Sequence, residues 1–226
     1  IALSLRDPNN KEHYAGSDDV WEKAERALRE AVKNKGIKAR EMIGEAAFYG
    51  PKTDFMVRDA LGRDWQCSTV QLDFVQPENF QLEYIGEDGQ PHRPVMLHRA
   101  VTGSTERFMA MIIEHYAGAF PVWLAPVQAI IIPIADRHQE YANQVLDILK
   151  SAGVRAEVDS RSERMNAKVR DAQLMKIPYM LVVGDKEVSE NTVSVRLRTN
   201  ENLGATPLDT FVTHITEIIA SKSPEL

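Results

Sequence analysis

The sequence predicts two domains of different class, an α+β domain followed by an α/β domain. The first half holds one amphipathic helix and then segments that alternate apolar and polar residues, which is typical of an antiparallel sheet. In the second half, short continuous apolar runs alternate with helical patterns, which indicates a largely parallel or mixed sheet. The prolines of "AFPVWLAP" separate the two patterns, so we expect domains at 1–124 and 125–226.

The first domain opens with a helix. Apolar residues recur on one helical face between residues 17 and 36, behind a Ser17/Asp18 cap and before a glycine. The segments 52–59 and 64–74 then alternate around a turn, which predicts an antiparallel strand pair.

A third strand and a second helix should complete this domain. The strand, 94–101, follows the turn-rich "GEDGQPHRP". The helix is expected from about Ser104 to Tyr116 and is apolar nearly all round. Such a helix is usually buried, so we expect this one to lie inside the domain.

The second domain should alternate strands and helices. In order, the patterns predict strand 127–134, helix 137–151, strand 154–158, helix 163–175, strand 178–183, a turn at Gly184-Asp185, strand 192–198 and helix 207–220.

Composition narrows the class of protein. The chain has 226 residues, 43% hydrophobic and 27% charged, and its longest apolar run falls far short of the roughly 20 residues that cross a bilayer. We therefore expect a cytoplasmic protein without membrane partners. One cysteine excludes an internal disulfide and a cysteine-rich zinc site.

Charge gives a local signal only. The formal charge is −6, which argues against a general affinity for nucleic acid. The segment 160–176, however, carries five Lys/Arg against two Asp/Glu. This basic strip is compatible with a phosphate-bearing partner, although a solvated helix face is the commoner reason for such a run.

A polar row marks the strand around Cys67. Alternation places these residues on one face: Trp65, Cys67, Thr69, Gln71 and Asp73. Lys52, Asp54, His98 and Tyr49 fall on neighbouring segments. Buried polar groups need partners, so the row indicates a hydrogen-bond network or a ligand pocket; an ordinary solvent-facing sheet side is the alternative.

Two single residues add chemistry. A lone His98 is most often a core histidine, because a metal ligand needs partners. Arg107 falls in the first turn of a helix, where a cation is unfavourable unless an anion binds there or Glu106 offsets it. A nucleotide phosphate would satisfy Arg107, the Ser104 hydroxyl and the free amides together.

Five segments together resemble one family. In order they are "AFYGPK", "WQCSTVQLDF", "HRAVTGSTERF", "FPVWLAPVQ" and "PYMLVVGDKEV". This set is similar to the C-terminal half of bacterial threonyl-tRNA synthetases over essentially the whole chain. The resemblance implies a class II antiparallel active-site sheet followed by an α/β anticodon-binding domain with a mixed sheet.

The resemblance implies roles for individual residues. "GSTERF" corresponds to the third class II motif, so Arg107 would bind ATP and act in catalysis together with Lys52. Gln66, Thr69 and Gln71 would lie near the ribose and phosphates of the adenylate, and Tyr49, Lys52, Cys67 and Ser104 near threonine. Alternation directs Gln66 away from the row unless a bulge intervenes.

The same resemblance implies metal and tRNA sites. His98 would be one of three protein ligands of a zinc ion, and the other two, a cysteine and a histidine, have no counterpart in this chain. Mg²⁺ would accompany ATP. Glu187 and Arg196 match anticodon-reading positions, and Ser162 and Lys176 stand where many relatives have Asn and Arg.

The implied activity is ligation of threonine to tRNA(Thr) through threonyl-adenylate, by a full-length homodimer. The first and second class II motifs would precede Ile1, so we expect the isolated chain to be inactive. One alternative is a non-catalytic tRNA-binding or regulatory module. Another is a related synthetase for proline, glycine or histidine, in which His98 would not bind a metal.

Overall fold

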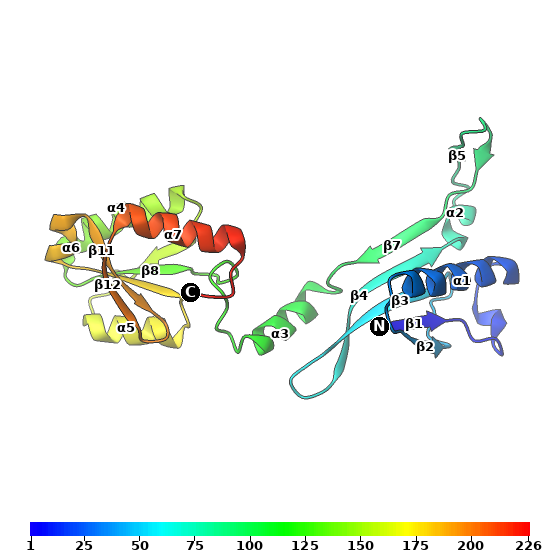
Figure 1. Cartoon of the computed structure of the whole chain (residues 1–226), viewed down its shortest axis with the longest axis horizontal. Helices are drawn as coiled ribbons and strands as arrows, with labels where there is room; N and C mark the ends of the chain where they lie inside the picture. Colours follow the sequence, from blue (N-terminus) through cyan, green and yellow to red (C-terminus); the bar gives the residue numbers. More distant parts are fainter. The chain divides into compact units, whose positions relative to one another are not determined.

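The computed structural model describes residues 1–226 and divides into two compact units, Ile1–His115 and Tyr116–Leu226 (Figure 1). The division comes before the expected boundary after residue 124. Val122 is completely buried in the core of the second unit, and Arg155 donates a hydrogen bond to the carbonyl of Trp123, so this linker packs with the second unit. None of the helices is both long and apolar enough to cross a membrane.

The first unit is built on a five-stranded sheet in the order β2-β1-β3-β4-β7. The strands are β1 (Ala2–Leu5), β2 (Arg40–Ile43), β3 (Lys52–Arg58), β4 (Asp64–Asp73) and β7 (Met96–Ala100). Only the β1–β2 pair is parallel; the other three pairs are antiparallel. The antiparallel sheet predicted from β3, β4 and β7 is therefore confirmed.

Helix α1 (Asp18–Asn34) covers one face of this sheet (Figure 1). Leu28 of α1 packs with Leu3 and Leu5 of β1, and Leu72 of β4 joins the cluster. Because side chains alternate along a strand, the neighbours of these leucines, Ser4 among them, point to the opposite face. That opposite face carries the polar row.

Smaller elements lie in the connections between these strands. They comprise a 3₁₀ turn (Lys11–His13), α2 (Val75–Asn79) and a small hairpin formed by β5 (Tyr84–Ile85) and β6 (Pro91–His92).

A β-bulge in β4 changes which residues share the polar face. Phe55 pairs with Ser68 but Met56 pairs with Gln66, so Cys67 is the extra residue. The bulge turns Gln66 onto the face of Thr69, and alternation then puts Trp65 on the other face. The expected common face of Trp65, Cys67 and Thr69 is therefore wrong, because strict alternation cannot continue through a bulge.

Helix α3 (Thr105–His115) ends the first unit and is not buried as expected. None of its residues is buried, and Phe108, Met109 and Ile113 are exposed. The apolar residues of a helix predict that it packs against something, but they do not say that the packing surface belongs to the same 226 residues.

The second unit has a mixed five-stranded sheet in the order β12-β11-β10-β8-β9. Its strands are β8 (Ala129–Pro133), β9 (Ala156–Val158), β10 (Tyr179–Val183), β11 (Thr192–Leu197) and β12 (Asn202–Pro207). The three strands β9, β8 and β10 are parallel, whereas β11 and β12 are antiparallel. The predicted mixed sheet is confirmed, although the sequence patterns did not predict β12.

Helices cover both faces of this sheet (Figure 1). They are α4 (Gln139–Ser151), preceded by a 3₁₀ turn (Asp136–His138), α5 (Met165–Leu174), the short α6 (Asp185–Glu190) and α7 (Leu208–Ser221). Apolar residues of α4 and α7 pack on Ile131 and Leu181, and those of α5 pack on Ile132 and Val182. Each central strand is thus buried on both sides, which explains its continuous apolar run.

Candidate active site and anticodon-domain residues

A buried carboxylate organises the polar face of the first unit. Asp54 on β3 accepts hydrogen bonds at Oδ2 from Ser4 Oγ (2.9 Å) and Lys52 Nζ (2.7 Å). At Oδ1 it accepts from Gln66 Nε2 and Thr69 Oγ1, both at 2.7 Å. An ionised carboxylate has about four acceptor positions, so all the hydrogen-bond acceptor positions of Asp54 are occupied. Three of the four donors, Lys52, Gln66 and Thr69, are predicted site residues.

An open cavity of about 690 Å³ lies over this face. Its lining includes six residues that the sequence analysis assigned to the active site: Tyr49, Lys52, Gln66, Thr69, Gln71 and His98. The volume is in the range of small-molecule sites. The structure therefore brings together predicted residues from the turn before β3, from β3 itself, from β4 and from β7.

The turn before β3 brings Tyr49 to the cavity. Gly50 packs so closely on β4 that a Cβ atom there would lie 1.8 Å from the carbonyl oxygen of Leu72. Gln71 Nε2 donates to the carbonyl of Gly50 at 3.2 Å. Only glycine fits this approach, and Tyr49 and Gln71 are held on the same edge of the site as a result.

His98 is oriented by a second buried carboxylate. Its Nε2 lies 2.7 Å from Oδ2 of Asp73, which is completely buried, and its ring meets the Tyr49 ring edge-on at 5.5 Å. The other oxygen of Asp73 accepts the backbone N–H groups of Val75 and Gln76 at the start of α2. Asp73 thus ties the imidazole to the backbone.

This pairing suits a metal ligand. Metal-binding histidines commonly donate their second ring N–H to a carboxylate, which leaves the other nitrogen for the metal. In His98 that nitrogen is Nδ1, if Nε2 carries the proton that bonds Asp73. No three His, Cys, Asp or Glu side chains of the chain form a metal-binding group.

Arg107 lies beside the cavity lining but is not part of it. Its Nη1 donates to the backbone carbonyl of Gln66 at 3.2 Å, and its guanidinium stacks on the ring of Trp65, 5.7 Å from the ring centroid. Its own N–H donates to Ser104 Oγ at 3.2 Å, so Ser104 caps α3. An aromatic face and a serine cap stabilise the helix start without the anion that the sequence analysis invoked.

Cys67 and Ser104 are not among the lining residues of the cavity, although the resemblance places both near threonine. Cys67 is buried, and its sulfur lies 3.1 Å from the sulfur of Met111 on α3. The bulge explains this difference, because it rotates Cys67 away from the polar face.

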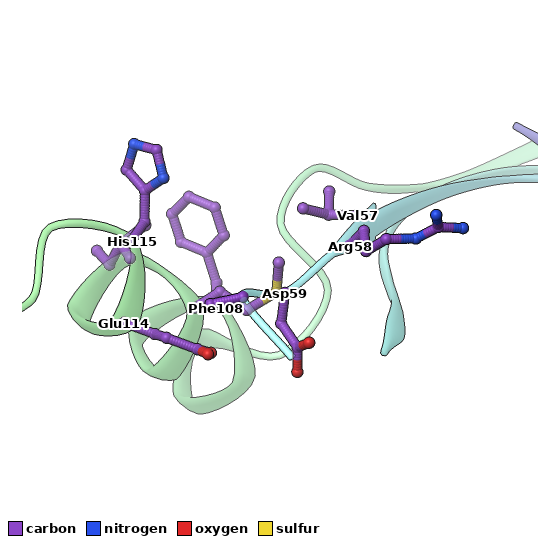
Figure 2. Close-up of a pocket in the computed structure, with 9 residues that line it drawn as sticks. Val57, Arg58, Asp59, Phe108, Glu114 and His115 are labelled. Carbon is purple, nitrogen blue, oxygen red and sulfur yellow. The ribbon is translucent and has the colours of Figure 1, made fainter. Parts of the chain in front are cut away.

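A second cavity, of about 400 Å³, lies between the β3–β4 hairpin and α3 (Figure 2). Figure 2 shows Val57 and Asp59 on the hairpin side and Phe108, Glu114 and His115 on the helix. None of the predicted site residues lines it. Hydrogen bonds from Trp65 and Arg63 hold the pKa of Asp59 at about 2, so this carboxylate is ionised at neutral pH.

The four predicted anticodon residues lie at several places in the second unit. Glu187 is in the first turn of α6, where its Oε2 accepts the Gly184 N–H at 3.0 Å. Arg196 lies beside a bulge in β11, and its Nε is buried without a hydrogen-bond partner. Lys176 adopts a positive φ of 58° and donates to the carbonyl of Ala117.

Ser162 lines a polar cavity of about 320 Å³ at the end of β8. The lining includes Arg161, Arg164 and the buried Lys168, which donates to the carbonyl of Asp159 at 2.9 Å. Arg161 is itself paired with Asp159 and Asp171, which raises the pKa of its guanidinium. The basic strip predicted from the sequence is therefore partly neutralised by its own carboxylates.

Sequence reasoning did not identify the two buried carboxylates that hold the active-site side chains in place. Asp54 and Asp73 both belong to the polar rows that alternation places on one face, and both are almost completely buried. A carboxylate flanked by apolar strand residues was the available signal. Its partners depend on the pairing of β1 with β3 and of β4 with β7, which the sequence patterns do not give.

Two family models match the chain, one for each unit. Residues 9–116 match the family model described as "tRNA synthetase class II core domain (G, H, P, S and T)", and residues 128–218 match "Anticodon binding domain". Together these two models cover most of the chain.

Curated relatives are similar along the whole sequence. The chain is 54% identical to a threonine–tRNA ligase of Acidobacterium capsulatum over 100% of its own length and 33% of that protein. It is 52% identical to a threonine–tRNA ligase of Thermus thermophilus over 93% of the chain and 32% of the relative. The chain thus spans about a third of the length of the curated relatives that it matches.

Solved structures agree as well. The RNA-binding domain of threonyl-tRNA synthetase from Cryptosporidium parvum superposes with a TM-score of 0.87 at 37% identity, covering 96% of this chain and 54% of that one. A putative threonyl-tRNA synthetase from Aeropyrum pernix gives 0.70 at 29% identity, covering 100% and 56%. The chain therefore carries part of a class II tRNA synthetase core and an anticodon-binding domain, and along its whole length it is similar to threonyl-tRNA synthetases.

Proposed function

We propose that the protein carrying this chain ligates threonine to tRNA(Thr) in an ATP-dependent reaction, as a homodimer in its full length. The observation that carries the proposal is the set of Lys52, Gln66 and Thr69 fixed around buried Asp54 on a class II core sheet. A preorganised polar face of this kind suits a substrate that bears several charges. Identity of 50% or more to threonine–tRNA ligases supports threonine as the amino acid.

The reaction has two steps. The threonine carboxylate attacks the α-phosphorus of ATP, which forms threonyl-adenylate and releases pyrophosphate. A hydroxyl of the terminal ribose of the tRNA then attacks the threonyl carbonyl, and AMP leaves. Catalysis of this kind depends on positioning and charge neutralisation more than on covalent chemistry.

The chain's own cations support the first step. Lys52 and Arg107 are the residues proposed to offset the charge that develops on the phosphate oxygens. Gln66, Thr69 and Gln71 would orient the ribose and phosphates, and Tyr49 would border the threonine site. Mg²⁺ bound with ATP would neutralise the outer phosphates.

Threonine selectivity is proposed to involve zinc held in part by His98. Zinc bound there would coordinate the amino and hydroxyl groups of threonine. Asp73 contributes by fixing the imidazole, and Tyr49 packs against the ring. A site built to bind a hydroxyl rejects valine, because its polar groups would otherwise stay unpaired.

The second unit is proposed to read the anticodon. Arg196 supports this most directly, because a buried guanidinium N–H without a partner is costly unless a ligand accepts from it. Unstacked anticodon bases offer such acceptors and a face for stacking. Glu187, Ser162 and Lys176 are the other proposed contacts, with Lys176 providing a point charge rather than a planar fork.

Threonine-dependent exchange of pyrophosphate into ATP tests the proposal in the longer natural protein. We expect exchange with threonine, much weaker exchange with valine, and aminoacylation of tRNA(Thr). Tight tRNA binding without any exchange would instead favour the non-catalytic module.

The chain of 226 residues by itself is expected to give no exchange, because it spans about a third of the length of the threonine–tRNA ligases that it matches. Robust exchange by this polypeptide would contradict that expectation.

A further inference from the structure

Two guanidinium groups lie over the ring of Trp65. The guanidinium carbon of Arg107 is 5.7 Å from the ring centroid, and that of Arg63 is 5.5 Å from it. Both distances fall within the range of cation–π attraction, which is about 6 Å. The family comparison and the proposed function assign no role to this tryptophan, which alternation places on the face opposite the polar row.

The orientation of the Trp65 ring is fixed by Asp59. The indole Nε1 donates to Asp59 Oδ2 at 2.9 Å. The same carboxylate accepts the backbone N–H of Leu61 at 3.0 Å and of Arg63 at 2.8 Å, and the side chain of Arg63 at 2.6 Å. With its side chain only 1% exposed, Asp59 is a rigid part of the hairpin turn.

The backbone at the start of α3 packs against the β-bulge at Cys67 of β4. Gly103 has a φ of +70°, and a Cβ atom there would lie 2.9 Å from the carbonyl oxygen of Cys67. Ser104 caps the first turn. These contacts place the Cα atom of Arg107 but leave its long side chain to be directed by other groups.

The groups that direct this side chain do not neutralise it. The guanidinium of Arg107 is held by the carbonyl of Gln66 and by the aromatic face of Trp65, both of which are neutral. Its charge therefore stays available for an anion. Gln66 also lines the active-site cavity through its side chain, so the held guanidinium lies next to the cavity wall.

We infer that Trp65, oriented by Asp59, positions the guanidinium of Arg107 for nucleotide binding. The inference rests on the proposed function, in which Arg107 binds ATP. Trp65 and Asp59 are positioning residues in this account, since neither lines the active-site cavity. An arginine side chain that is already ordered loses less conformational entropy on binding, which increases affinity for the ligand.

Pyrophosphate exchange by the longer natural protein tests the inference. Trp65→Leu should raise KM for ATP roughly three- to tenfold, because a cation–π contact and its preorganisation are lost, while KM for threonine stays within about twofold. Trp65→Phe keeps an aromatic face but loses the bond to Asp59, and should recover part of the loss. Arg58→Gln, which removes an exposed cation of the same hairpin that pairs with Asp64, is the matched control and should leave KM for ATP unchanged.

A double-variant measurement separates positioning from structural support. ATP binding is measured by equilibrium titration in wild type, Trp65→Phe, Arg107→Ala and the double variant. If Trp65 acts through Arg107, Trp65→Phe weakens binding in the wild-type background and causes no further loss in the Arg107→Ala background. This comparison uses Trp65→Phe, so it still tests the inference if Trp65→Leu does not fold.

Three outcomes overturn the inference. Equal increases of KM for ATP and threonine would make Trp65 a structural residue, as would additive losses in the double variant. Wild-type protein without threonine-dependent exchange would instead overturn the proposed function. Wild-type activity that is lost with Arg107→Ala but retained with Trp65→Leu would leave the proposed function intact and reject the positioning role.

Discussion

The ammonium nitrogen of Lys52 lies 2.7 Å from Oδ2 of Asp54, a carboxylate that is only 4% exposed. Hydrogen bonds between charged groups are stronger than neutral ones, and the carboxylate side of this pair is shielded from water. Gln66 and Thr69 donate to the other oxygen of the same carboxylate. Three of the side chains proposed to meet ATP therefore depend on one buried carboxylate.

Asp54→Asn should disrupt this arrangement. An asparagine keeps the volume but replaces one acceptor oxygen with a donor, which opposes either Lys52 or Gln66. We expect kcat/KM for adenylate formation in the longer protein to fall on the order of 100-fold, the effect of a misplaced binding group. Pyrophosphate exchange measures this.

Asp64→Asn is the control for Asp54→Asn. Asp64 is an exposed carboxylate of the same strand pair and bonds Arg58 across the hairpin. Its replacement should change activity little, because exposed ion pairs contribute little. Full activity of the Asp54 variant would show that the site residues hold their positions without the carboxylate.

Asp73→Asn should weaken zinc binding in the longer protein. The asparagine has a single acceptor oxygen, so it can accept from His98 or from the start of α2 but not from both, and it no longer carries the charge that makes the imidazole a stronger ligand. Loss of such an outer partner typically costs about 10- to 100-fold in metal affinity, and competition with a chelator measures it. Asp88→Asn changes an exposed His–Asp pair and should leave zinc affinity unchanged. Equal affinities of the wild type and the Asp73 variant would contradict the role of Asp73.

Tyr179 predicts how the chain responds to high pH. Burial raises the pKa of this phenol to about 12, above its usual value of about 10. The unfolded chain therefore loses this proton at lower pH than the folded chain does. The corresponding stability is fully present below about pH 10 and is lost as the pH rises toward 12.

The free energy of unfolding as a function of pH checks this. Tyr179→Phe, which has no phenol to ionise, should show a shallower decline above about pH 10 than the wild type does. Tyr84→Phe, on an exposed strand, should keep the wild-type slope. Parallel curves for the wild type and the Tyr179 variant would show that the phenol ionises equally in both states.

Patterns that repeat within a strand or helix predicted most of the fold. The alternation in β3 and β4 and the continuous apolar runs of β8 and β10 each reflect burial on one or both faces. The strands β1 and β2 have four residues each, too few for a period to stand out. Their existence follows from pairing with each other and with β3, which is a tertiary property.

The sequence predicted most of the residues of the active-site face, but it did not predict which face Gln66 and Cys67 point to. Lys52, Thr69 and Gln71 share a face because they follow the strand period. Gln66 joins them and Cys67 leaves them because one extra residue enters β4, and nothing in the local sequence marks that insertion. The exposure of α3 was equally hidden, since an apolar helix shows only that a covering surface is required.

Arg196 offers a test in which stability and binding should change in opposite directions. Its Nε is buried and has no hydrogen-bond partner, so the free chain carries an uncompensated desolvation cost of about 1–3 kcal/mol. Arg196→Met keeps the aliphatic length and removes this cost. We expect the free energy of unfolding to stay the same or rise by up to ~1 kcal/mol.

The same variant should bind tRNA more weakly. Loss of an arginine that reads a base typically costs about 1–3 kcal/mol, which corresponds to roughly 5- to 150-fold in affinity. Titration of tRNA(Thr) with the chain measures this, and Lys150→Gln on α4 is a control for the loss of one positive charge. A residue that serves the fold would show the reverse, with reduced stability and unchanged affinity. The opposite changes expected for Arg196→Met, in stability and in tRNA affinity, would assign the buried Arg196 Nε to RNA binding rather than to the fold.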